Sequence, residues 1–95
     1  MAKIKWSKDS LDDLKEICQF IALDSPYYAK LLIDRIFEMV EHLRLFPEMG
    51  RKVPEADDPN VRELIYKNYR IIYQIKESCL EIITVIHGSR LLRLR

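Results

Sequence analysis

The 95-residue sequence has only two glycines and two cysteines, and no apolar run reaches the ~18 residues that a membrane span needs. Few glycines and a hydrophobic share of 48% exclude a low-complexity chain and favour a packed domain. Neither Cys18 nor Cys79 has a partner at zinc-ligand spacing, and two cysteines so far apart do not resemble the cysteine pattern of a disulfide-stabilised domain. Because the N-terminus also lacks the pattern of a signal peptide, we expect one cytoplasmic domain over residues 1–95, with no metal, cofactor or membrane contact.

Recognisable catalytic motifs are also missing, and the charge is unevenly spread. There is no Walker loop, zinc motif, or serine or cysteine triad. The net charge of +1 combines −3 over residues 1–60 with +4 over residues 61–95. This division predicts that the C-terminal part meets nucleic acid or an acidic protein segment. An imbalance on solvated strands is the alternative.

Hydrophobic periodicity predicts one short strand and two helices in the first half of the chain. Residues 3–6 alternate between polar and apolar, which is typical of a strand with one buried face. Apolar residues at helical spacing predict helices over about 8–23 and 26–45, with Ser7 and Ser25 as N-caps. The short connection between the helices indicates an antiparallel hairpin.

Three runs rich in β-branched and aromatic residues follow the polar, proline-containing segment 51–60. They cover residues 61–66, 69–75 and 79–87. Two residues separate the first two runs, which is the length of a tight hairpin turn. The order β-α-α-β-β-β predicts an α+β domain, in which a helical hairpin packs on one face of a small, largely antiparallel sheet.

Side-chain alternation in the run 69–75 divides it between two faces. The face assigned to the helices holds Tyr69, Ile71, Tyr73 and Ile75, and the face expected to be open holds Arg70, Ile72 and Gln74. If the run 61–66 pairs with it in a suitable register, Arg62 and Arg70 approach the same surface, but the sequence does not fix that register. His87, Gly88 and Arg90 come where the last run ends, and the glycine permits a turn there.

A cluster of His87, Arg70 and Arg90 would have the parts for metal-free RNA cleavage. Arginine binds phosphate with two parallel hydrogen bonds and stays charged, and histidine, with a reference pKa of ~6.5, suits proton transfer near neutrality. Each residue also has a structural interpretation, as a hydrogen-bonded strand end or an ion-paired surface group. The residues alone indicate only a small α+β domain with a basic sheet end.

The segment VRELIYKNYRIIYQIKESCLEIITVIHGSR resembles the C-terminal half of the RelE/ParE superfamily of bacterial toxins. The segments DSPYYAKLLIDRIF, LRLFPEMGR and VPE resemble its N-terminal part, so that the resemblance covers nearly the whole chain. It implies the toxin of a type II toxin–antitoxin pair. It also implies a cognate antitoxin, encoded in the same operon, which wraps the toxin in a hetero-oligomer and neutralises it.

The superfamily divides by target. RelE-like members cut mRNA on the translating ribosome, and Arg70 and Arg90 match two of their arginines. The lysine-rich strand of some RelE members is missing, however, and no tyrosine follows Tyr73. ParE-like members inhibit DNA gyrase and lack the nuclease residues, and the VIH strand end and the FPEMGR loop look more like theirs.

The expectation is therefore a ParE-like toxin that arrests growth by inhibiting gyrase and is not an enzyme. The alternatives are a ribosome-dependent mRNA endonuclease with His87, Arg70 and Arg90 as catalytic residues, and a non-toxic interaction domain of the same fold. Nucleic acid or another anionic partner is expected to be bound by Arg62, Lys67, Arg70 and Arg90.

Overall fold

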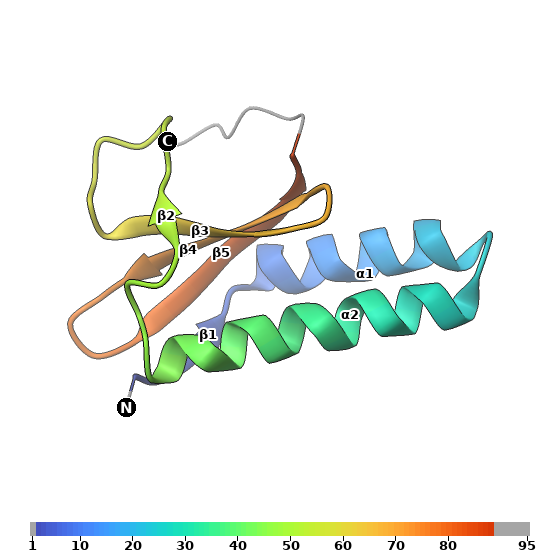
Figure 1. The fold of residues 1–95 in the computed structure, drawn as a ribbon, viewed down its shortest axis with the longest axis horizontal. Helices are drawn as coiled ribbons and strands as arrows, with labels where there is room; N and C mark the ends of the chain where they lie inside the picture. Colours follow the sequence, from blue (N-terminus) through green and yellow to red (C-terminus); the bar gives the residue numbers. More distant parts are fainter. Residues whose placement is uncertain (1, 89–95) are drawn as a thin grey trace.

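The computed structural model describes residues 2–88 and shows two helices on one face of a five-stranded sheet (Figure 1). The elements are β1 (Ile4–Trp6), α1 (Lys8–Ala22), α2 (Pro26–Glu41), the 3₁₀ helix η1 (His42–Arg44), β2 (Arg51–Lys52), β3 (Val61–Tyr66), β4 (Tyr69–Ile75) and β5 (Leu80–His87). The strand order is β1-β5-β4-β3-β2, with β1 parallel to β5 and the other pairs antiparallel. The predicted α+β class is confirmed, and β2 is a short addition within the expected loop.

Both long helices begin at a serine, as the sequence predicts. The hydroxyl oxygens of Ser7 and Ser25 accept hydrogen bonds from the backbone N–H three residues later, at 3.0 and 3.1 Å. Such a cap contributes about 1 kcal/mol because it satisfies an N–H that the helix leaves unpaired. The second helix ends at Glu41 and is followed directly by η1, so the single helix predicted to reach about residue 45 corresponds to these two elements.

Helix α1 also covers the edge of β5 where β1 has ended. The Ser7 hydroxyl donates to the Ile83 carbonyl at 2.8 Å. The Asp13 carboxylate accepts from the Val85 N–H at 3.0 Å and from the Thr84 hydroxyl at 2.5 Å. Polar side chains of the helix thus satisfy backbone groups that an unpaired strand edge would leave open.

The main core lies between the helices and the sheet. Its buried side chains are Leu14, Leu32, Ile36, Val40, Leu43, Leu64, Ile71, Tyr73, Leu80, Ile82 and Val85. Strand β4 contributes Ile71 and Tyr73 to this face, as the alternation predicts. Burying an aliphatic or aromatic side chain of this size contributes roughly 1.5–3 kcal/mol, so this layer fixes the position of the sheet on the helices.

The opposite face of the sheet is not open throughout, contrary to the expectation from the sequence. Val53, Val61 and Ile72 form a second small core there, against which Ala56 packs. Ile72 is completely buried, so its assignment to an open face is wrong. Two helices do cover only one face, but the segment that follows β2 crosses part of the other.

The register of β3 and β4 separates two arginines that were expected to meet. The closing pair of the hairpin is Tyr66 with Tyr69, which places Arg62 opposite Tyr73. Arg70 lies opposite Ile65. Because paired residues of neighbouring strands share a face, Arg62 and Arg70 lie on opposite sides of the sheet, and the predicted common surface is wrong.

Candidate functional site

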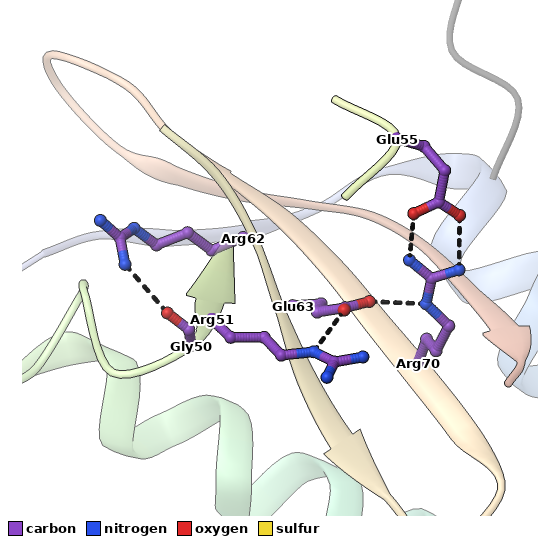
Figure 2. A network of polar contacts seen from close by, with 6 residues as sticks. All are labelled: Gly50, Arg51, Glu55, Arg62, Glu63 and Arg70. Carbon is purple, nitrogen blue, oxygen red and sulfur yellow. Dashed lines mark hydrogen bonds and ion pairs between the residues drawn. The ribbon is translucent and has the colours of Figure 1, made fainter. Parts of the chain in front are cut away.

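Arg70 lies at the centre of an ion-pair network on the sheet face opposite the helices (Figure 2). Its Nη1 and Nη2 donate to the two oxygens of Glu55 at 2.7 and 2.8 Å, and its Nε donates to Glu63 at 2.6 Å. Glu63 also accepts from Nε of Arg51 at 2.6 Å. We name these four residues the Arg70 network.

The network keeps the Arg70 guanidinium charged. The hydrogen bonds that Arg70 donates to Glu55 outweigh the opposing effect of burial and, together with the one that it donates to Glu63, raise the pKa of Arg70 above its ordinary value. Only 8% of the Arg70 side chain and none of the Glu63 side chain are exposed. A buried charge needs such partners because an unpaired ion away from water costs several kcal/mol.

Arg62 points away from the Arg70 network, as Figure 2 shows. Its Nη1 donates to the carbonyl oxygens of Gly50 at 3.0 Å and Glu48 at 3.3 Å. Arg62 therefore ties the segment after η1 to strand β3, and it does not share a surface with Arg70.

Tyr73 fastens the same segment from β4. Its hydroxyl donates to the Pro47 carbonyl at 2.7 Å and accepts from the Gly50 N–H at 2.9 Å. Burial raises the pKa of the Tyr73 phenol, and the hydrogen bond from Gly50 opposes this shift. A Cβ atom on Gly50 would lie 2.6 Å from the Tyr73 hydroxyl oxygen, so the close approach requires glycine.

We expect Tyr73 to ionise at a higher pH than an ordinary tyrosine when phenolate absorbance is followed in alkaline solution. A tyrosine in the unfolded chain ionises near ~10, below the raised folded value, so the unfolded state binds fewer protons in that range. The free energy of unfolding should therefore fall as the pH rises through it. Tyr73→Phe should remove the late transition and Tyr27→Phe should keep it; a late transition that survives in Tyr73→Phe contradicts the assignment.

His87 and Lys67 lie at the end of the sheet where β3 turns into β4. His87, the last residue of β5, pairs with Tyr69, and the two rings meet edge to face with their centroids 5.8 Å apart. Lys67 occupies the turn with a φ of 52°, and its Nζ lies 5.9 Å from the centroid of the Tyr66 ring. Arg90, the remaining predicted site residue, lies outside the described residues.

An open groove of about 530 Å³ runs beside the Arg70 network. Its walls include Arg51, Glu55, Lys67 and Arg70, together with the apolar Pro54 and Ile65. The structure thus brings two of the predicted anion-binding residues, Lys67 and Arg70, into one groove. It also brings a carboxylate into that groove, which the sequence did not predict.

The described residues 2–88 contain no cluster of side chains suited to binding a metal ion. No three His, Cys, Asp or Glu side chains in that range are arranged to hold a metal ion. The same range contains no helix with the length and apolar character that crossing a membrane requires. Cys18 and Cys79 are both free thiols.

Large apolar side chains are exposed at the turn of the helical hairpin. Phe20, Leu23 and Tyr27 expose 72%, 83% and 78% of their surface. We name these three residues the hairpin tip; Figure 1 shows the turn at the end of the hairpin that extends beyond the sheet. Exposed aromatic and aliphatic side chains gathered in this way are typical of protein contact surfaces.

Residues 4–92 match the family described as the ParE toxin of the type II toxin–antitoxin system parDE. The chain belongs to this family. The fold is also similar to a solved structure described as the chromosomal ParDE TA system from P. aeruginosa, with a TM-score of 0.75. The two chains are 23% identical, and the match covers 92% of this chain and 96% of that chain. A comparison with curated proteins finds no significant match.

Membership of the ParE toxin family confirms the resemblance to the RelE/ParE superfamily and favours the ParE branch. The carboxylates of the Arg70 network were nevertheless missed. Glu63 lies between Val61 and Ile65 on the same face of β3. A carboxylate between apolar residues on one face of a strand is a signal of a buried ion pair. Glu55 gave no comparable signal because it lies in the polar segment between β2 and β3.

Proposed function

We propose that this ParE-family toxin arrests growth by binding and inhibiting DNA gyrase, and that a cognate antitoxin neutralises it. Family membership supports a toxin of a type II toxin–antitoxin pair. The observation that favours a binding mechanism over RNA cleavage is the pairing of Arg70 with Glu55 and Glu63.

RNA cleavage by this sheet would require the Arg70 guanidinium to hold the scissile phosphate. All three of its nitrogens donate to carboxylates instead. A phosphate entering the groove would meet the negative charge of Glu55, and two like charges about 4 Å apart near a protein surface repel by up to about 4 kcal/mol. A toxin that acts by occupying a target needs no such cation.

The hairpin tip is the surface that we propose for contact with the target. Interfaces depend on a few large apolar anchors, and pre-ordered anchors lose little entropy on binding. The tip meets both conditions, because its side chains are exposed and the Ser25 cap fixes the start of α2 beside them.

The double variant Phe20→Ser, Tyr27→Ser should raise the toxin concentration needed for half-inhibition of gyrase supercoiling by about tenfold or more, since losing an anchor typically costs about 2 kcal/mol. The melting temperature should change little because both side chains are largely exposed. Leu45→Ser is a matched control, since Leu45 is 66% exposed at the other end of the hairpin. Equal losses in the two variants would contradict a role specific to the tip.

The target itself is tested with two assays on the purified chain. Inhibition of gyrase supercoiling, without cleavage of mRNA on translating ribosomes, is the expected result. Codon-specific mRNA cleavage with unaffected supercoiling would replace the proposal by the mRNA endonuclease. Co-expression of the neighbouring gene should restore growth, and continued arrest would contradict neutralisation by its product.

A further inference from the structure

Glu55 differs from the other members of the Arg70 network because it does not belong to a strand. Arg51, Glu63 and Arg70 come from β2, β3 and β4 and together carry a net charge of +1. Glu55 brings the sum for the four side chains to zero. The sheet therefore presents a site for one carboxylate, and the segment between β2 and β3 supplies it.

The buried apolar contact of that segment with the sheet is made at Val53, two residues before Glu55. Val53 is buried and Ala56 packs against the small second core, but none of residues 54–60 is buried. Val53 can stay in the small second core while the partly exposed Glu55 side chain leaves Arg70, so exchanging Glu55 for another carboxylate need not expose that core. Such an exchange would have to replace the two hydrogen bonds between Glu55 and Arg70.

The groove beside the network gives a ligand access to this contact. Lys67 adds a further positive charge to its wall, and Ile65, which is 45% exposed, adds an apolar surface. A ligand with one anionic group between apolar neighbours matches this combination. The planar contact of two guanidinium nitrogens with two oxygens also suits a carboxylate.

We propose that Arg70 binds a carboxylate from an acidic segment of a partner protein, which takes the place of Glu55. In the free protein Glu55 occupies the site and keeps the guanidinium paired. A partner segment binds when its own carboxylate, its neighbouring apolar side chains and the positive charge of Lys67 together outweigh the contact with Glu55. This inference goes beyond the proposed function and does not depend on the target of the toxin.

The test uses two short peptides with blocked termini that copy residues 53–56, one with Glu and one with Gln at the position of Glu55. Binding is followed through the NMR signal of the Arg70 Nε–H in the Glu55→Gln variant. The Glu peptide should bind about tenfold more tightly than the Gln peptide, as expected when about 1.4 kcal/mol is gained. It should bind the wild-type chain about tenfold more weakly than the variant, because Glu55 competes.

Adding Arg70→Lys to the Glu55→Gln variant, with folding checked by circular dichroism and binding followed through the backbone N–H signals of β4, should abolish the preference for the Glu peptide, since lysine cannot make the two parallel hydrogen bonds. Equal binding of the two peptides to Glu55→Gln, or no gain over the wild-type chain, would overturn the proposal. Tighter binding of inorganic phosphate than of the Glu peptide would overturn the choice of a carboxylate ligand.

The wild-type chain provides a second measurement if Glu55→Gln does not fold. The Glu peptide at high concentration should shift the Arg70 Nε–H signal to saturation, whereas the Gln peptide should not. The absence of a shift with the Glu peptide up to its solubility limit would then decide against the proposal.

Discussion

Replacing Glu63 with alanine is expected to lower the free energy of unfolding by about 3–5 kcal/mol, the range for breaking a buried ion pair. The Glu63 side chain is completely buried and accepts hydrogen bonds at 2.6 Å from both Arg51 and Arg70. Its loss leaves Arg70, also almost completely buried, with less compensating charge. In a domain of this size the melting temperature should fall by about 12 °C or more.

Denaturant unfolding of Glu63→Ala and of Glu77→Ala provides the comparison. Glu77 is exposed and lies in the turn between β4 and β5, so its removal should change the free energy of unfolding by no more than about 0.5 kcal/mol. A loss in Glu63→Ala no larger than that in the control would show that the Arg70 network contributes nothing to stability.

Gly50→Ala is the second substitution with a large expected effect, about 3 kcal/mol, near the upper end for overpacking a core. The added Cβ would lie 2.6 Å from the Tyr73 hydroxyl oxygen and 2.7 Å from the Glu63 carbonyl oxygen. Neither atom can easily retreat, because Tyr73 is buried and bonded to Pro47 and the carbonyl belongs to β3. Thermal and denaturant unfolding should both report the loss.

Two further variants separate this clash from a general effect of replacing glycine. Gly88→Ala should cost less, about 1 kcal/mol at most, since the nearest atom to its Cβ would be 3.2 Å away. In a Tyr73→Phe background Gly50→Ala should also cost less, because one of the clashing atoms has been removed, and the coupling should reach about 0.5 kcal/mol or more. Full additivity of these two changes would argue against the contact.

Periodicity, caps and turn length were sufficient to predict the helices and the three long strands. Ser7 and Ser25 act locally, and the alternation in β4 reflects a core that covers one face. The two-residue turn also determines the register of β3 and β4. A hairpin that closes at Tyr66 and Tyr69 places Arg62 opposite Tyr73, and therefore on the other face of the sheet from Arg70. The expectation of a common surface overlooked this pairing.

The ion pairs of Arg70 could not be predicted from the sequence, for a different reason. Alternation assigned it correctly to the face away from the helices, but whether that face meets water depends on the path of residues 53–60. This segment is polar and contains prolines, so its position depends on a small long-range cluster around Val53 rather than on local propensity. Glu55 lies in this segment, so its contact with Arg70 depends on the same long-range cluster.

The parallel pairing of β1 with β5 makes the order of synthesis important. Ile4–Trp6 pairs with residues 80–82, which are made more than seventy residues later. Contacts between such distant segments form slowly, because closing a long loop costs entropy before the contacts compensate. Until β5 has been translated the chain lacks the strand between β1 and β4, whose Leu80, Ile82 and Val85 are part of the core. The fold can therefore be completed only after β5 has been made, and products truncated before β5 should lack the folded toxin domain.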